Sequence, residues 1–419
     1  MSALKYWLWL SSLKGVGAKS AAEIIEEFGS PERAFFADKD AIEASKLTSA
    51  EKTAISDKSL MRAGKIMHDC RENGITILTI NDASYPERLR NIYDPPVVLY
   101  MKGNVPFIDE EAAIAIVGTR SCTPYGVKNA ERIGYEIARC GGVVVTGLAR
   151  GIDSAAAFGA IRAGGRVIGV LGCGLDIVYP RGNERLFEDV CVNGGIISEY
   201  PPGMPPMAGN FPIRNRIMSG ISSGVLVIEA PVHSGALITA ARALEQGRDV
   251  FVLPGNVDAS SCEGSNQLLR EGATAVMRGE DIISEYTALF PEKLRIVPKD
   301  EMTPLDTRGR NRLVEREASE TENEDAKEQK EPVNTEKEQK TAKIPIDNHT
   351  DVAYSDLSER PDGISDDEYE VLKVLTRELQ ADEIVELSGI PASRALAALT
   401  LLEIQGYIVQ KAGKHFTRK

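Results

Sequence analysis

The sequence predicts an α/β protein whose central sheet is parallel and covered by helices on both faces. Three apolar, β-rich runs each end abruptly in a glycine and a polar turn, over 113–123, 143–153 and 167–176. Strand-like and helical stretches alternate over 75–290, which is typical of strand–helix–strand units in a parallel sheet. The strands of such a sheet end on one carboxyl edge, where ligands bind in this class of fold.

The first 72 residues are predicted to form a small helical module. An apolar helix at 6–10 and a second helix at 18–28 flank the sequence Gly15-Val-Gly17. This hairpin resembles a helix-hairpin-helix element, whose backbone amides can hold a phosphate. An αα-hairpin that only packs the module together explains the sequence equally well.

The α/β core is predicted over 75–295. Strand-like runs occupy 75–80 and 97–103 before the three glycine-ended runs, and 224–231 and 249–257 after them, with a helix at 238–246. The predicted strand ends on the carboxyl edge are Gly118, Thr146, Gly172, Glu229 and Pro254.

The composition changes over 298–363 to a charged segment almost free of large apolar residues. It cannot bury enough surface to offset its ordering entropy, so we expect a disordered acidic linker. Residues 364–419 are predicted to form three helices and a hairpin at 407–417, which is the pattern of a winged helix. The third helix of such a module often enters a DNA groove. Arg394 is its only strong cation here, so a protein and a DNA partner are equally compatible with it.

Charge and cysteine usage restrict the class of protein. The net charge of −13 over 419 residues argues against a surface coated with basic groups, but not against a local basic groove. No apolar run approaches the roughly 20 residues of a membrane helix, and the N-terminus lacks signal-peptide features. The six cysteines are scattered without a CxxC pair, as expected for reduced thiols. We therefore expect a cytoplasmic protein without a membrane partner.

Few residues are suited to catalysis, and we expect no enzymatic activity, no metal and no cofactor. The turns at 118–123 and 172–177 match a dinucleotide-binding GxGxxG poorly, and no GxxxxGK[ST], GxSxG or HExxH motif occurs. The four histidines form no cluster. Asp153, Asp176 and Glu229 follow predicted strands, where we expect them to cap helices or hold turns rather than to hydrolyse a substrate.

Arginines are more informative than the acids. Five of them are predicted in loops at or near the carboxyl edge, and the planar guanidinium group matches phosphate oxygens bidentately. Phe211 precedes two of them in the sequence FPIRNR, and a base stacked on an aromatic ring beside cations is how single strands are held. Taken alone, Phe211 fits a position in the apolar core as well or better. The segment 234–239 opens a predicted helix and offers a further cradle for an anion. The five arginines are Arg120, Arg150, Arg181, Arg214 and Arg216.

Seven segments in order carry a resemblance to a known family. They are VGTRSCTPYG, VVTGLARGIDSAAA, GVLGCGLDIVYPRGN, SEYPPG, FPIRNRIMSGIS, VIEAPVHSGALITAARALEQGRDVFVLPG and EGSNQLLREGA. Over about 75–290 the sequence resembles the DNA-processing protein A family, also called DprA or Smf. The resemblance implies a Rossmann-like core between a SAM-like or helix-hairpin-helix module and a winged helix. It also implies a non-catalytic homodimer that protects incoming single-stranded DNA in natural transformation and loads RecA recombinase onto it.

The resemblance also assigns residues. The family's G-x-R-x-x-[ST] turn matches 118–123, its phosphate contacts carry over to Arg120, Arg181, Arg214 and Arg216, and its aromatic residue is Phe211. The stretch 205–210 lacks the lysine that some members carry there. The candidate nucleic-acid-binding residues are Gly118, Arg120, Thr123, Gly147, Arg150, Arg181, Phe211, Arg214, Asn215, Arg216, Ser234 and Gly235, and the dimer candidates are Leu244, Asn266 and Leu269.

Two other functions compete with this one at the level of the residues. The first is an enzyme or sensor that acts on a small nucleotide through Glu229 and the 234–239 turn. The second is an interaction scaffold in which the winged helix makes the decisive contact. The fold class alone does not choose among them, because similar cores bind many ligands.

Overall fold

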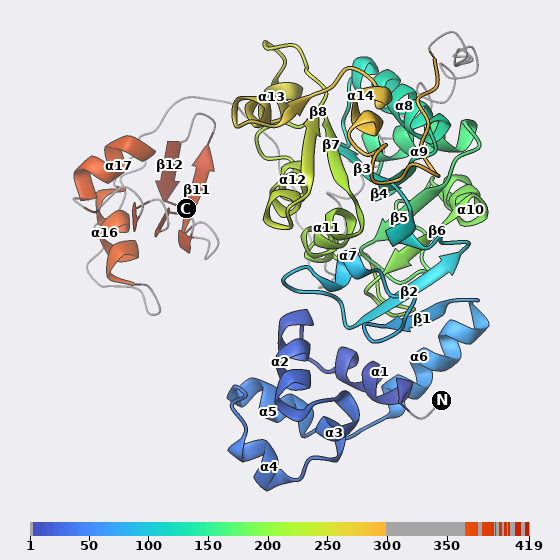
Figure 1. Ribbon diagram of the computed structural model, residues 1–419. Coiled ribbons are helices and arrows are strands. Elements are labelled where there is room, and N and C mark those ends of the chain that lie inside the picture. Colours follow the sequence, from blue (N-terminus) through green and yellow to red (C-terminus); the bar gives the residue numbers. More distant parts are fainter. Residues whose placement is uncertain are drawn as a thin grey trace, which may run out of the picture. The chain divides into compact units, whose positions relative to one another are not determined.

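A computed structural model describes residues 3–298 and, nearer the C-terminus, 365–375, 379–388, 390, 394–395, 398–399, 401–402, 407–411 and 415–418. Apart from Pro298, the predicted linker lies outside the described residues. The chain divides into two compact units, Met1–Ala318 and Ser319–Lys419, which are described separately below (Figure 1).

The first unit begins with the predicted helical module. Its first helix buries Leu8, Trp9 and Leu10 almost completely, and the Trp9 indole donates a hydrogen bond to the carbonyl of Asp57, 2.6 Å away. This contact ties the first helix to the segment between the fifth and sixth helices of the module. The helices are α1 (Leu4–Ser12), α2 (Ala18–Phe28), α3 (Pro31–Phe36), α4 (Lys39–Ala44), α5 (Ser49–Ile55) and α6 (Met61–Glu72).

The core of the first unit is a nine-stranded sheet, of which seven neighbouring strands are parallel. The expected parallel sheet is therefore confirmed for its main part, whereas the first two strands pair antiparallel at one edge. Sequence reasoning also missed two short strands, 194–198 and 274–275. In spatial order the strands are β1 (Thr76–Thr79), β2 (Val98–Gly103), β6 (Gly194–Ser198), β5 (Val167–Leu171), β4 (Val143–Thr146), β3 (Ala113–Gly118), β7 (Gly224–Ile228), β8 (Asp249–Val252) and β9 (Thr274–Ala275).

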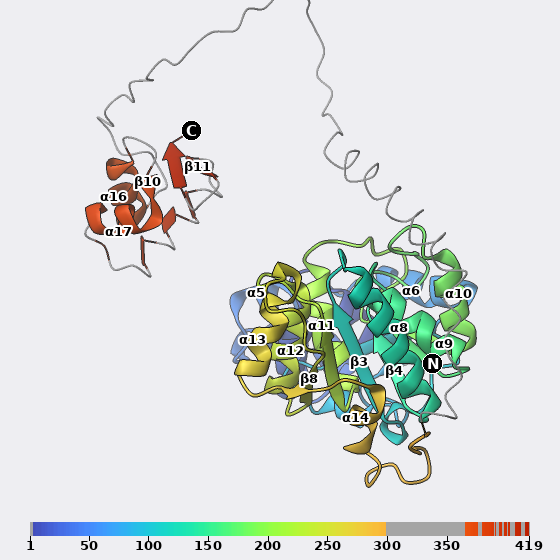
Figure 2. The same ribbon diagram turned by 90° about the horizontal axis from the view of Figure 1, so that it is seen from above.

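The central strands are buried on both faces, as their branched residues predict. Figure 2 shows β3 between helices on either side. One face packs against α8 (Pro124–Arg139), α9 (Ile152–Arg162), α10 (Glu184–Val192) and α14 (Gly279–Ser284). The other face packs against α7 (Glu87–Arg90), α11 (Asn210–Ile221), α12 (Gly235–Glu245) and α13 (Glu263–Arg270). Two short 3₁₀ turns, η1 (Ile108–Glu110) and η2 (Ser260–Cys262), complete the core.

The second unit has the elements of a winged helix. Its apolar core contains Leu372, Ile384, Leu402 and Phe416. Arg394, the strong cation of the third predicted helix, donates two hydrogen bonds of 2.8 and 2.6 Å to the carboxylate of Asp367. The elements are α16 (Asp366–Val374), β10 (Leu379–Gln380), α17 (Ala381–Ser388), β11 (Ile408–Lys411) and β12 (His415–Arg418), and the sheet order is β10-β12-β11.

No helix in the described parts of the chain combines the length and the apolar character needed to cross a bilayer.

Candidate nucleic-acid interface

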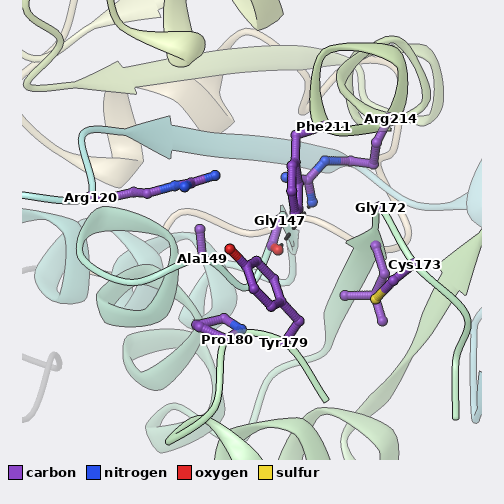
Figure 3. A pocket seen from close by; sticks show the side chains of 10 residues that line it. Arg120, Gly147, Ala149, Gly172, Cys173, Tyr179, Pro180, Phe211 and Arg214 are labelled. Carbon is purple, nitrogen blue, oxygen red and sulfur yellow. Dashed lines mark hydrogen bonds between the residues drawn. The ribbon is translucent and has the colours of Figure 1, made fainter. Parts of the chain in front are cut away.

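A pocket lies at the carboxyl ends of β4 and β5, where the sequence places its glycine turns. Helix α11 forms one wall, and the turn after β3 and the segment around Pro180 contribute others. Figure 3 shows the Arg120 side chain pointing at the ring of Phe211, and the Arg214 side chain reaching the same ring from the opposite direction. The lining residues are Arg120, Gly147, Ala149, Leu171, Gly172, Cys173, Tyr179, Pro180, Phe211 and Arg214.

Arg120 and Phe211 form the solvent-facing part of this site. Arg120 is exposed in the turn that follows β3, and its guanidinium carbon lies 5.4 Å from the centroid of the Phe211 ring. Phe211 is half-buried in the first turn of α11, and the ring of Tyr179 lies 5.4 Å away at an interplanar angle of 33°. A Cβ atom on Gly172 would come within 3.1 Å of the Phe211 ring, so the glycine lets the ring sit close to the end of β5.

Arg214 lies on α11, not in the loop that the sequence suggested. Its side chain is buried, and Nη1 donates hydrogen bonds to the carbonyl of Gly147, at 3.1 Å, and to that of Val170. Burial lowers the pKa of this guanidinium group, and the negative charge of Asp153 opposes that shift. Arg214 thus joins the ends of β4 and β5 beneath the pocket.

Arg216 also lies on α11 rather than in a loop, and the structure does not bring it to the pocket. Its side chain is 3% exposed and donates to Asp94, at 3.0 Å, and to Glu199, at 2.8 Å. The two carboxylates hold the pKa of Arg216 above its usual value against the opposite effect of burial. A buried guanidinium group with two half-buried acidic partners is a structural ion pair, so the surroundings of Arg216 do not support the predicted phosphate contact.

The three acids at the strand ends have structural partners, as expected. Glu229, in a left-handed backbone conformation with φ 47°, accepts hydrogen bonds from the backbone N–H of Thr123, at 2.8 Å, and from its hydroxyl. Asp153 accepts the N–H of Gly147 at 3.1 Å, and Asp176 accepts the N–H of Gly203 with both oxygens. These bonds hold the start of α8 and two turns, and each of the two Glu229 oxygens accepts a hydrogen bond from Thr123.

Of the remaining predicted residues, Gly147 lines the pocket and the others do not. Gly118 permits the close pairing of β3 with β7, because a Cβ there would lie 2.0 Å from the carbonyl oxygen of Ile228. The Ser234 hydroxyl accepts the N–H of Ala236 at the start of α12, and Asn215 donates to the carbonyl of Gly235 at 3.2 Å. Arg150 is half-buried after β4, and Arg181 is exposed beside the pocket residue Pro180.

The expected dimer residues lie on α12 and α13. Leu244 is 61% exposed on α12. The Asn266 side-chain amide exchanges two hydrogen bonds with the backbone of Gly255, and Leu269 packs partly against the core. Leu244 is thus the one of the three that offers a large exposed apolar surface.

The described residues show neither a cluster of metal ligands nor a reactive thiol at the pocket. The described residues contain no group of three or more histidine, cysteine or acidic side chains placed to hold a metal ion. Burial raises the pKa of the Cys173 thiol, which lines the pocket, to about 11, so this thiol is a poor nucleophile at neutral pH. All six cysteines are free thiols.

Sequence reasoning missed Tyr179 and the pairing of Arg214 with Asp153. The Tyr-Pro-Arg-Gly-Asn sequence at 179–183 drew attention to Arg181 alone, although an aromatic residue two positions earlier is the stronger sign of a stacking surface. Asp153 follows a strand by several residues, and the sequence around it does not indicate that its partner is Arg214, 61 residues later.

Comparisons with known proteins agree with this fold. The model of the family called DNA recombination-mediator protein A matches residues 76–287, and a DprA winged-helix model matches 356–414. The chain is 42% identical over 221 residues to the DNA processing protein DprA of Bacillus subtilis, a match that covers 53% of this chain and 74% of that protein. It is 43% identical over 210 residues to the DprA of Streptococcus pneumoniae, covering 50% of this chain and 73% of the other.

A solved structure extends the agreement to the backbone. The X-ray structure of DprA from Streptococcus pneumoniae aligns with a TM-score of 0.60 and 33% identity, covering 68% of this chain and 99% of that one. The expected Rossmann-like core with a C-terminal winged helix is thereby confirmed. The chain belongs to the DNA recombination-mediator protein A family, the DprA or Smf group of DNA-processing proteins.

Proposed function

We propose that the carboxyl edge of the sheet binds single-stranded DNA, with Phe211 as a base-stacking surface and Arg120 and Arg181 as phosphate contacts. The observation that carries the proposal is the exposed guanidinium group of Arg120 next to the half-buried ring of Phe211. An aromatic face beside an exposed cation suits a base and its phosphate, because every base has a π-face and phosphate contacts carry no base code.

The form of the pocket favours a strand over a free nucleotide. Its empty volume of about 270 Å³ includes space that is open to solvent, so the pocket is a partly open recess rather than a closed cavity that would enclose a small molecule. Glu229, the carboxylate that a nucleotide-hydrolysing enzyme would use, is 2% exposed and bound to Thr123. A ligand that lies across the edge therefore fits better than one enclosed within it, which supports a binding protein rather than an enzyme.

The assembly and the recipient of the DNA are also part of the proposal. The exposed Leu244 on α12 supports self-association through α12 and α13, in line with the homodimer that the family resemblance implies. The same resemblance supports a role in natural transformation, in which the dimer protects incoming single strands and loads RecA recombinase onto them. In the second unit, Asp367 compensates the charge of Arg394, which favours a protein partner for the winged helix over a DNA backbone.

A salt titration tests the proposal. Fluorescence anisotropy of a labelled oligothymidine is measured at a series of salt concentrations, with duplex DNA and a mononucleotide as competitors. Each arginine that neutralises a phosphate contributes about 0.7 to the slope of log K against log salt, so Arg120→Ala should make the slope shallower by about 0.7. Arg33→Ala, an exposed arginine of the helical module, is the matched control and should leave the slope unchanged. Competition by the mononucleotide as strong as that by the oligonucleotide, with a slope near zero, would contradict the proposal.

A further inference from the structure

Arg214 and Asp153 hold the backbone of the same residue, Gly147, through the two peptide groups on either side of its Cα atom. The carbonyl of Gly147 accepts a hydrogen bond from Arg214 Nη1, and its N–H donates to Asp153 Oδ2, each at 3.1 Å. Arg214 also donates to the carbonyl of Val170, so it connects the ends of β4 and β5. The two side chains are 5% and 6% exposed, and their opposite charges attract each other.

The same guanidinium group supports the stacking surface. Phe211 and Arg214 are three positions apart on α11 and therefore lie on one face of that helix. The guanidinium carbon of Arg214 is 5.9 Å from the Phe211 ring centroid, and its side chain approaches the ring from the opposite direction to that of Arg120 (Figure 3). Phe211 thus has two cations close to its ring, one buried and hydrogen-bonded and one exposed.

The two arginines differ in what they can offer a ligand. Arg120 is exposed and its side chain points at the ring from the solvent side (Figure 3). Arg214 uses Nη1 for two backbone carbonyls and Nε for the side-chain oxygen of Asn215, so a phosphate could engage the guanidinium group bidentately only by breaking one of these hydrogen bonds. Leaving those carbonyls without a donor in a buried site is unfavourable.

We infer that Arg214 and Asp153 are positioning residues that hold Phe211 and the turn after β4 in place to receive a nucleobase of a single strand, and that Arg214 is not one of its phosphate contacts. The inference rests on the proposed function and deepens it, because it separates the arginine that meets the DNA from the arginine that shapes the surface. It also assigns a role to Asp153, which carries none in the family resemblance described above.

Neutralising Asp153 separates the two roles. If Arg214 were a phosphate contact, Asp153→Asn would remove a nearby negative charge and tighten the binding of oligothymidine. If the pair positions Phe211, Asp153→Asn weakens binding, although the protein becomes more positive. We expect the variant to lose the part of its binding affinity that comes from base stacking. The measurement is therefore the ratio of the affinity for oligothymidine to the affinity for an abasic strand of equal length. Stacking of one base predicts a ratio of about 5 to 150 for the wild type.

Three variants complete the experiment. Asp153→Asn and Arg214→Lys should both lose most of the base-over-abasic ratio, with the salt slope unchanged, and neither should reduce the ratio further in a Phe211→Ala background. Arg120→Ala should do the reverse, with a shallower slope and a retained ratio. Thermal unfolding of each variant establishes that it is folded. If Asp153→Asn does not fold, Arg214→Lys decides, because lysine keeps the charge but cannot reproduce the planar fork.

The outcomes distinguish this inference from the proposed function. Wild-type protein that does not bind oligothymidine defeats the proposed function itself. The other case is that wild-type protein binds oligothymidine. Tighter binding by Asp153→Asn, or a shallower salt slope for Arg214→Lys, would then overturn only the positioning role.

Discussion

Gly147 and Arg214 approach each other so closely that residue 147 cannot carry a side chain in the present arrangement. A Cβ atom on Gly147 would lie 2.4 Å from Nη1 of Arg214 and 2.7 Å from its guanidinium carbon. The glycine that ends the second apolar run therefore makes room for a side chain of the protein itself, and its N–H is already bound to Asp153. A glycine turn at a sheet edge is thus not by itself a site for a phosphate.

Gly147→Ala should consequently displace the Arg214 guanidinium group. Overpacking of this kind costs roughly 1–3 kcal/mol of folding free energy, and we expect a loss of single-strand affinity through the altered position of Phe211. Chemical denaturation and anisotropy measure the two effects. Gly209→Ala is the matched control, because the space around that glycine is open and its backbone is helical. Unchanged stability and affinity in Gly147→Ala would show that the turn adapts more readily than the structure indicates.

Arg216→Met should be destabilising without a specific effect on DNA. The substitution leaves Asp94 and Glu199 beside a buried position without their cation, which typically costs about 3–5 kcal/mol. The salt slope of the folded protein should stay at the wild-type value, because Arg216 does not reach the pocket. Lys19→Met, which removes the cation of an exposed pair with Glu23, should change stability by no more than about 1 kcal/mol. A slope that becomes shallower in Arg216→Met would restore the phosphate contact that the sequence resemblance implies.

Glu229 gives a test of the competing enzymatic function. Glu229→Gln keeps the size of the side chain, but only one of the two amide positions can accept a hydrogen bond, so one bond from Thr123 is lost. A hydrogen bond to a charged group contributes about 1.5–3 kcal/mol, and we expect a loss of stability in that range. Thr123→Val removes the hydroxyl partner, and a double-mutant cycle should show that the two changes are not additive. The enzymatic function would be supported instead if the wild type turned over a nucleotide and a fully stable Glu229→Gln variant did not.

The sheet could be predicted because its chemistry is local. Strands buried on both faces are runs of branched residues, as in 113–117 and 143–145, and their glycine-ended turns mark the carboxyl edge. The missed strand β6 begins with two glycines and contains only two branched residues. A Cβ on Gly194 would lie 2.1 Å from the carbonyl oxygen of Val167, so the close approach of β5 requires glycine at this position. Because glycine is uncommon in strands, the sequence of β6 does not have the pattern of a strand.

Helix α11 escaped prediction for a different reason. Its buried residues include Arg214, Asn215 and Arg216, which a pattern of apolar periodicity assigns to the surface. Their burial becomes favourable only through acids and carbonyls brought from distant parts of the chain, such as Asp94, Asp153 and Glu199. Interactions between residues so far apart in the sequence are set by the tertiary fold. The basic sequence FPIRNR therefore indicated a functional region, but it did not show which arginine faces the ligand.

The pH dependence of stability should report on Asp153. Burial raises the pKa of this carboxyl group to about 6, in spite of the attraction of Arg214 and of hydrogen bonds from Gly147, Ala149 and Thr146. Between the pKa of an unfolded aspartate, about 4, and that value, the folded protein binds more protons than the unfolded chain. Stability therefore falls as pH rises through this window, because a buried carboxyl must ionise in the folded state.

The measurement compares the free energies of unfolding of wild type and Asp153→Asn from pH 4 to pH 6. The amide does not titrate, so the wild-type value minus the variant value isolates the contribution of Asp153 from that of every other carboxylate. This difference should decrease with rising pH, by at most about 1.4 kcal/mol per pH unit. If it instead increases over the same interval, the attraction of Arg214 outweighs desolvation. Asp153 would then be an ordinary ion-paired carboxylate, and the pair would stabilise the fold most at neutral pH.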